Sequence, residues 1–423
     1  MRDWKNIYSV LDRSKQKYAF YSGSYDYKDF IDNAKIVRQL AKQKVGWGKR
    51  AVEVRANKMR FDQFENDTLG LNDIFAKYRV PEALEKLKDD VLVCGCGFLA
   101  VNGDRVFPFT AEEATGEFGF YDQNLTSGLA VYRKHRGDTL LDTQLPPDSY
   151  VEYYPDVTVV HEIDEKGKKF ERVENNVTRR PLIGLLTYRG TTRRPFGQSV
   201  LSRAARSAII DASRTVRQAM IAAHYYNTKV DVILGADSET PVDKIDGKTG
   251  DILKIGPNDN GQIPQIGELA QHAMAPFNDT ILTAAKNFCS DTKLSLANLG
   301  ISTDAPQSSE SLEIVNDDLK DDIISWEREL ADQLLYFAVT LFMHENELRD
   351  LDDNFREKVR ATKPVFYSVY RQDVSKFGDG LNKIAIEAPD IAKTREIWRG
   401  LGLSSKEIDM VINSVGQKTV GEL

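Results

Sequence analysis

The sequence predicts an α+β protein that is mainly helical and carries an antiparallel sheet. Three observations lead to this prediction. Apolar residues recur at helical spacing through most of residues 1–90 and 268–423, whereas 91–192 contain short runs rich in Val, Tyr and Thr between turn signals. A second, smaller group of strand-like runs lies in 228–267 and interrupts the helical pattern.

Length and composition bound the possible functions. A chain of 423 residues is too long for one ordinary core, so we expect two to four regions. The net charge of −7 argues against coating nucleic acid by electrostatic attraction, although nucleic acid could still pass a surface of this kind. The first residues, MRDWKNIYSVLDRSKQKY, lack the apolar stretch of a secretory signal, and LLYFAVTLFM is about half of the roughly 20 residues that span a bilayer. We therefore expect a soluble chain without a membrane partner.

Three cysteines leave one unpaired in any disulfide scheme and cannot supply four zinc ligands alone. If VLVCGCGFLAV is a strand, its period of two places Cys94 and Cys96 on the same face. Small residues pack easily there, so we predict a packing role for these two thiols, and a reducing compartment fits the cysteine count.

Residues 1–90 are expected to be mainly helical, with amphipathic stretches at 28–43 and at 81–93, where Pro81 suits a helix start. The strand-like runs that follow predict an antiparallel sheet. They are AVYRKH, YVEYYP, VTVVHEI, KKFERV and LIGLLTY.

A long helix is predicted over 199–227, with Ser199 as its N-cap. Its small and apolar face permits close packing of another helix. That face contains Leu201, Ala205, Ala208, Ile209, Ala212, Val216, Ala219 and Ala223. The opposite face contains Arg203, Arg206, Arg214 and Arg217.

Strands are predicted at KVDVIL and DILKIG, and helical periodicity returns at about 268, with Pro276 either opening a second helix or kinking the first. The polar stretch SLANLGISTDAPQSSESLEI then precedes a very long helix. Its apolar positions step by three or four from Leu312 to Leu341. Shorter helices follow, and Ser404 and Glu407 have the spacing of a capping box.

No catalytic constellation is evident. DGKTG lacks the first glycine of a phosphate loop, the five histidines form no HExxH pair, and the sequence contains no GxSxG serine elbow. Asp317, Asp318, Asp321 and Asp322 fall on a regular helix without the glycine turn of a calcium loop. A solvated or salt-bridged face explains them better than a metal site. We predict no catalytic residue, metal or cofactor.

The order helix, β insert, helix, polar loop, very long helix resembles the core of tailed-bacteriophage portal proteins. The resembling residues are FGQSVLSRAARSAIIDASRTVRQAMIAAHYYNTKVDVILG, ILTAAKNFCSDTKLSLANLGISTDAPQSSESLEIVNDDL and LGLSSKEIDMVINS, with VLVCGCGFLAV less specific. The main match covers roughly 190–345. The ordered series is more specific than any one motif within it.

The resemblance implies a virion protein, assembled in the host cytoplasm, that forms a ring, usually of twelve copies, through which double-stranded DNA enters and leaves the head. Other implied partners are the terminase large subunit, the major capsid and scaffolding proteins, and a head–tail adaptor. The implied regions are a wing (1–198), stem helix 1 (199–227), a clip (228–267), stem helix 2 (268–294), a tunnel loop (295–308), a long wing helix (309–347) and a short crown (348–423).

The resemblance also implies roles for residues. The tunnel loop would present Asn298, Gly300, Ser302, Thr303, Asp304, Gln307 and Ser308 to DNA. The clip would contact the motor and adaptor through Asp237, Asp246, Lys248 and Asp259. The loop lacks cations, which suits sliding, because each cation contact raises the affinity for a duplex. An ordinary connector between helices is the alternative from residues alone. The four stem arginines are expected to meet acidic residues of a neighbouring subunit or helix rather than DNA.

Two other functions fit parts of the sequence. One is a metal-dependent DNA-processing enzyme that uses the Asp pairs, with a set of four arginines as its nucleic-acid contact. That set comprises Arg179, Arg180, Arg193 and Arg194, for which protecting sheet edges is the simpler role. The other is a different ring-forming virion protein, such as a head-completion adaptor.

Overall fold

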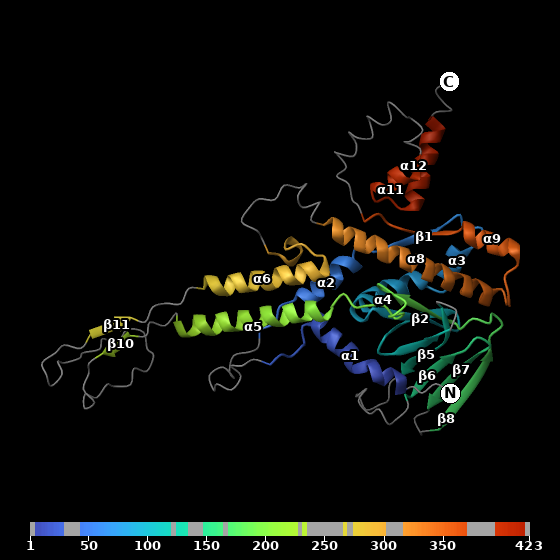
Figure 1. Cartoon of the computed structure of the whole chain (residues 1–423). Helices are drawn as coiled ribbons and strands as arrows, with labels where there is room; N and C mark the ends of the chain where they lie inside the picture. The colour runs from blue at the N-terminus through green and yellow to red at the C-terminus, as the bar shows by residue number, and fades with distance from the viewer. Residues whose placement is uncertain are drawn as a thin grey trace. The chain divides into compact units, whose positions relative to one another are not determined.

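The computed structural model describes residues 5–28, 43–119, 124–133, 147–163, 168–226, 231–234, 265–268, 274–301, 316–369 and 394–418 (Figure 1). The chain forms two compact units. The first contains Met1–Asp26, Gly46–Ser207 and Asn287–Leu423, and the second contains Tyr27–Val45 and Ala208–Lys286. Helices and antiparallel strands occur in both, which confirms the predicted α+β class. No helix in the described ranges is long and apolar enough to cross a membrane.

The N-terminal part of the first unit is helical, as predicted. Its helices are α1 (Lys5–Ser22), α2 (Trp47–Ala56), α3 (Leu71–Lys77) and α4 (Val80–Cys94). Pro81 lies in the first turn of α4, where its missing N–H is no loss. The hydroxyl of Tyr18 on α1 donates to Asp90 of α4 at 2.7 Å, and the Lys17 ammonium donates to the Cys94 carbonyl at 2.8 Å. The amphipathic stretch 28–43 lies almost wholly outside the described residues.

The segment VLVCGCGFLAV is not one strand, so the prediction that its two cysteines share one face of a strand was wrong. Helix α4 ends at Cys94, and strand β2 (Cys96–Asn102) begins two residues later. Gly95 between them has a φ of 97°, a left-handed conformation that ends a helix and is costly for residues with a Cβ. Cys94 and Cys96 therefore belong to different elements, and both are buried and free, as is Cys289.

Gly95 also lies where two backbones cross. Its carbonyl accepts a hydrogen bond from Tyr188 N at 2.9 Å, and Gln198 N donates to the Tyr188 carbonyl at 2.7 Å. A Cβ at Gly197, whose φ is +68°, would lie 2.2 Å from the Gly95 carbonyl oxygen. Only glycines fit this crossing, which joins the end of α4 to the segment after the sheet.

The predicted antiparallel sheet is present, but as two sheets (Figure 1). The smaller has the order β3 (Arg105–Thr110), β2, β9 (Ile183–Thr187). The larger has the order β4 (Ala114–Phe118), β5 (Leu125–Arg133), β6 (Ser149–Tyr153), β7 (Val157–Ile163), β8 (Lys169–Asn175). The buried hydroxyl of Tyr153 donates to the Val101 carbonyl at 2.9 Å and so links the two sheets. Every residue of β8 is exposed.

The predicted C-terminal helices are present together with a strand that was not predicted. The elements are α9 (Asp353–Ala361), β12 (Lys363–Phe366), α11 (Arg395–Gly400) and α12 (Ser405–Lys418). Strand β12 pairs antiparallel with β1 (Phe61–Glu65), about 300 residues earlier in the chain. The capping box is confirmed, because Ser404 N donates to Glu407 at 2.8 Å and Glu407 N donates to the Ser404 hydroxyl at 3.2 Å.

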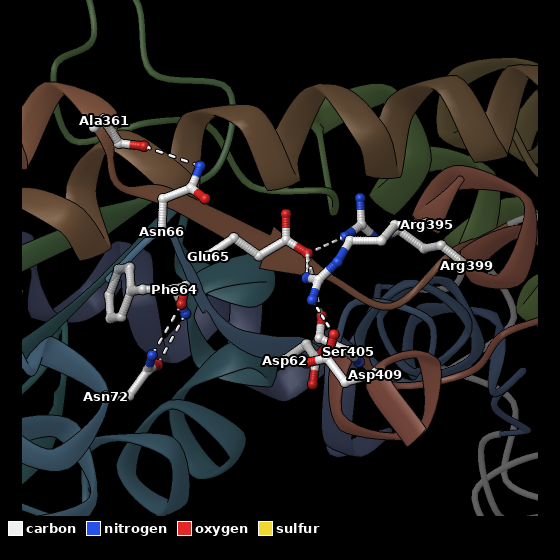
Figure 2. A network of polar contacts seen from close by, with 10 residues as sticks. All are labelled: Asp62, Phe64, Glu65, Asn66, Asn72, Ala361, Arg395, Arg399, Ser405 and Asp409. Carbon is white, nitrogen blue, oxygen red and sulfur yellow. Dashed lines mark hydrogen bonds and ion pairs between the residues drawn. The ribbon is translucent and has the colours of Figure 1, made fainter. Parts of the chain in front are cut away.

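An ionic network holds α11 and α12 on β1 (Figure 2). The Glu65 carboxylate pairs with Arg395 at 3.2 Å and with Arg399. Ser405 N at the start of α12 donates to Asp62 at 2.8 Å, and Ile408 beneath it is fully buried. These contacts join β1 to helices that lie more than 300 residues later in the chain.

Helix α5 (Arg203–Tyr226) begins later than predicted. Ser202, rather than Ser199, accepts a hydrogen bond from Ala205 N at 3.1 Å and so acts as the N-cap. Ser199 instead donates to the Val93 carbonyl at 2.6 Å. The predicted apolar face is buried from Leu201 through Ala212, whereas Val216, Ala219 and Ala223 are only half-buried.

The second unit contains a small antiparallel pair, β10 (Asp231–Leu234) and β11 (Gln265–Glu268). Strand β10 confirms the prediction at KVDVIL, while DILKIG lies outside the described residues. Strand β11 occupies the place where a helix was expected to resume at about 268, so that prediction was wrong. Helix α6 (Ala275–Thr292) begins only at Ala275, and Pro276 therefore opens it rather than kinking an earlier one.

Replacing Gly197 by alanine should destabilise the first unit much more than replacing Gly103. Both glycines have positive φ, but a Cβ at Gly103 would meet no atom within 4 Å. Gly103→Ala should therefore show only the cost of a left-handed L-residue, about 1 kcal/mol. Gly197→Ala should add a clash with Gly95 and lose about 3 kcal/mol or more. Equal losses in denaturant unfolding would contradict the close backbone crossing.

Candidate functional site

The tunnel-loop residues predicted from the sequence lie only partly within the described chain. Asn298 and Gly300 are described, and the others lie outside: Ser302, Thr303, Asp304, Gln307 and Ser308. The clip residues Asp237, Asp246, Lys248 and Asp259 also lie outside. The candidate site is therefore the base of the polar segment, where α6 ends and α8 (Asp317–Glu345) begins.

Of the long helix predicted over 309–347, residues 309–315 lie outside the described residues, and α8 covers Asp317–Glu345 of the rest. It begins at Asp317, with Asn316 at its N-cap position, and ends at Glu345. The predicted apolar ladder from Leu319 to Leu341 is buried, while Leu312 and Val315 lie outside the described residues. Asp317 pairs with Lys320 at 3.0 Å, as expected for a salt-bridged helix face.

Hydrogen bonds join the two sides of the polar segment at its base. The Asn298 side-chain amide donates to Oδ1 of Asn316 at 2.9 Å, and the Ser295 hydroxyl lies 3.4 Å from the same oxygen. Arg50 Nε of α2 donates to the Asn298 carbonyl at 2.7 Å. Asn298 lies in a single 3₁₀ turn, Ala297–Leu299, which Gly300 ends with a φ of 77°. Its amide, predicted to face DNA, is thus engaged within the chain.

A buried carboxylate, Asp322 of α8, lies close to this base. Its Oδ2 accepts hydrogen bonds from Arg55 Nε at 3.0 Å and from the Tyr188 hydroxyl at 2.6 Å. Its Oδ1 accepts from Arg189 Nε at 3.0 Å and lies 3.5 Å from Lys293 Nζ. The side chains of Arg55 and Asp322 are 1% and 3% exposed. A buried ion pair of this kind is costly to break from one side, because the remaining charge is left unpaired.

The environment of Asp322 keeps it ionised. Burial alone would raise the pKa of its carboxyl, but the Arg55 guanidinium, the Tyr188 hydroxyl and the Arg189 guanidinium together hold the pKa below its ordinary value. Burial and the neighbouring Asp322 charge raise the pKa of Tyr188, although the Arg55 and Arg189 guanidiniums oppose this. Tyr188 therefore stays a hydrogen-bond donor.

A second set of contacts fixes α8 to the end of β9. Trp326 Nε1 donates to the Thr187 carbonyl at 3.0 Å, and Thr187 N donates to Gln333 at 2.9 Å. Glu329 accepts from Gly190 N at 2.8 Å. Together with Asp322 these side chains form one row along the face of α8 that meets the strand. The sequence pattern identified the buried ladder, to which Trp326 belongs, but not the contacts of Asp322, Glu329 and Gln333 beside it.

The stem arginines occupy different environments. Arg203 is exposed, and Arg206 donates to the Ser202 carbonyl at 3.2 Å. Arg214 lies 3.6 Å from Asp211 of its own helix and donates to the Lys28 carbonyl at 3.0 Å. Pairing of these arginines with a neighbouring subunit remains a prediction.

Arg217 differs from the other three, because it is 2% exposed rather than turned to solvent. Of the two arginine pairs, Arg180 stacks over the Tyr336 ring at 4.8 Å, and Arg194 donates to Gln198 at 3.3 Å. Both contacts are within the chain.

Within the described ranges, no group of three or more His, Cys, Asp or Glu side chains could hold a metal ion. The acidic run at the start of α8 contributes one residue, Asp322, to the buried network and leaves Asp318 and Asp321 exposed. The Asp322 carboxylate is already paired with Arg55, Arg189 and Lys293, so the role that this arrangement supports is to hold the surrounding elements in place.

No protein-family model matches the chain, and no curated protein matches it in sequence. Three solved structures similar to it come from gene transfer agent particles. The neck of the native particle, computed with C12 symmetry, contains a chain with a TM-score of 0.45 and 13% identity, covering 95% of this chain and 98% of that one.

The neck of the empty particle, computed with C6 symmetry, contains a chain with a TM-score of 0.43 and 14% identity, covering 81% and 92% of the two chains. The virion of the native particle gives a TM-score of 0.42 and 13% identity, covering 78% and 86%. Likenesses at this level assign no role to the chain, whose function has to be inferred from its own residues.

Glu327 of α8 should make stability depend on pH. Its Oε1 is inaccessible and has no hydrogen-bond partner among the described residues, and burial raises the pKa of its carboxyl to about 8. The folded state thus binds this proton more tightly than the unfolded state, so the contribution of Glu327 to stability falls as pH rises from about 4.5 to about 8. Glu327→Gln should match the natural protein near pH 5 and exceed it by about 3 kcal/mol at pH 8.

Denaturant unfolding at the two pH values measures this effect. Asp332→Asn, at an exposed position of the same helix, is the matched control and should change stability little at either pH. If Glu327→Gln gave the same difference from the natural protein at pH 5 and pH 8, the carboxyl would not be the source of the pH dependence.

Proposed function

We propose that the chain is a subunit of a ring that forms the portal of a phage-like head and conducts double-stranded DNA. The broader part of this proposal is a structural role in the head or neck of such a particle. The narrower part is the portal itself, with its wing, stem, clip, tunnel loop and crown.

One observation carries the proposal. A polar segment without Lys or Arg, residues 295–308, leaves the end of α6 and leads to α8, and its base is closed by Asn298 and Asn316. The same two helices belong to the series α5, β10–β11, α6, polar segment, α8. The loop predicted from the sequence at 295–308 would be longer than most helix–helix connections, which have about 2 to 8 residues.

The composition of the segment supports sliding of a polyanion. Affinity for duplex DNA rises steeply with each Lys or Arg that contacts a phosphate, because counterions are released. A wall of Ser, Thr, Asn and Gln side chains offers hydrogen bonds without this gain. The net charge of −7 for the chain agrees with a conduit rather than with a protein that grips DNA.

The proposal includes partners that follow from it. A portal ring, usually of twelve copies, would contact the terminase large subunit during packaging and a head–tail adaptor afterwards, both through the clip. The major capsid and scaffolding proteins would surround the wing. The chain would carry no ATP-hydrolysing site of its own, so the motor would be supplied by the terminase.

The oligomeric state tests this function directly. The purified full chain should give native-mass peaks of a closed oligomer, with twelve copies as the expected number, and negative-stain images along the rotation axis should show a central opening. A monomer under all conditions, with metal-dependent cleavage of DNA, would contradict the proposal and favour the enzyme alternative.

Reversing the charge of Asp304 should slow DNA movement more than ring assembly. Asp304→Lys adds one cation per subunit to the proposed channel wall, so DNA should be packaged or released more slowly. Because 6 to 10 phosphate contacts lose about 10³ to 10⁵ in affinity between 50 and 200 mM salt, added salt should relieve the defect. Asp332→Lys, at an exposed position of α8, is the control. Packaging at the natural rate by Asp304→Lys would argue against a channel position.

A further inference from the structure

Arg189 and Lys293 share an unusual backbone conformation. Their φ values are 53° and 54°, in the left-handed region that residues with a Cβ seldom adopt. Arg189 follows the end of β9 by two residues, and Lys293 directly follows α6. Each therefore sets the direction in which the chain leaves an element, toward α5 in one case and into the polar segment in the other.

Both side chains end on the same oxygen of Asp322. Arg189 Nε donates to Oδ1 at 3.0 Å, and Lys293 Nζ lies 3.5 Å from it. Their side chains are 38% and 42% exposed, in contrast to Arg55, which occupies Oδ2 and is 1% exposed. Oδ2 of the carboxylate is therefore buried and joins α8 to Arg55 of α2. Oδ1 is more open and contacts Arg189 and Lys293, the residues at which the chain leaves β9 and α6.

The end of α6 has a second tie to this cluster. Arg55 donates through Nη2 to the Thr292 carbonyl and through Nη1 to the Ala51 carbonyl at 2.9 Å. The last residue of α6 and the residue after it are therefore both held at Asp322, one through Arg55 and one through Lys293. Left-handed L-residues persist where their surroundings fix them in this way.

We infer that Asp322 is the positioning residue for the polar segment, and that its Oδ1 holds Lys293 and Arg189 in left-handed conformations that set where the two connections leave the core. This inference rests on the proposed portal function. A channel constriction needs the polar segment of every copy at the same angle, and Asp322 would set that angle. Asp322 acts through Lys293 and Arg189 and is not itself placed in the channel.

Replacing Lys293 separates positioning from folding. Lys293→Gln removes the charge that meets Oδ1 but leaves the Arg55–Asp322 pair intact, so the protein should fold with a nearly unchanged melting temperature. Amide exchange in residues 294–301 should become about tenfold faster, because the tie at the start of the segment is lost. Lys293→Arg should restore the slow exchange, since it keeps a cation of similar reach.

Matched variants and a second site sharpen the test. Lys286→Gln, at an exposed position of α6, should leave exchange in 294–301 unchanged. Arg189→Gln should speed exchange in 190–198, whereas Arg193→Gln in the same connection should not. Exchange in 294–301 equal to that of the natural protein in Lys293→Gln, or equally fast exchange in Lys293→Arg, would overturn the inference.

The outcomes are distinguishable from failure of the proposed function. Exchange measures the subunit alone, so the result stands whether or not a ring forms. If the natural protein forms rings, Lys293→Gln should also form them, with the same number of copies by native mass, but should retain packaged DNA less uniformly. Rings that retained DNA like the natural protein, despite faster exchange, would overturn the link between Asp322 and the channel.

Discussion

The burial of the Asp322 charge is the constraint on which the first unit depends. A carboxylate that is 3% exposed is tolerated only when cations and hydrogen-bond donors surround it. Those donors come from α2, from the segment after β9 and from the end of α6, so the charge is satisfied only when all of these meet α8. Apolar burial along α8 brings the elements close, and the carboxylate selects one arrangement among the ways they could pack.

The backbone crossing at Gly95 and Gly197 works with this cluster. It places Tyr188 between two main-chain hydrogen bonds, to Gly95 and from Gln198. The ring of Tyr188 then meets Trp326 edge-on at 5.6 Å, and its hydroxyl reaches Asp322. The close approach of Gly95 and Gly197 therefore helps to fix the position of Tyr188, and Tyr188 in turn contacts the Asp322 carboxylate of α8.

Local patterns in the sequence predicted much of the fold. The buried ladder of α8, four strands of the larger sheet (β5 to β8) and the Ser404–Glu407 capping box all depend on residues within a few positions of each other, and all are present. The pairing of β1 with β12 and the Arg55–Asp322 contact join residues that are hundreds of positions apart, so no local pattern signals them. Two element boundaries were predicted wrongly. The strand expected across Cys94 begins only after the left-handed Gly95, and the N-cap expected at Ser199 is Ser202. Both boundaries depend on the backbone conformation of single residues, which the spacing of apolar residues does not reveal.

The outermost strand of the larger sheet has a consequence for solubility. Among the described strands, β8 pairs with β7 alone, and Phe170 and Val173 on it are 48% and 57% exposed. Open edges of this kind can template the addition of foreign strands. Lys168 over the Phe170 ring and the Arg172–Glu174 pair at 2.8 Å place charged side chains at this edge, and charged side chains on an open edge oppose the addition of foreign strands.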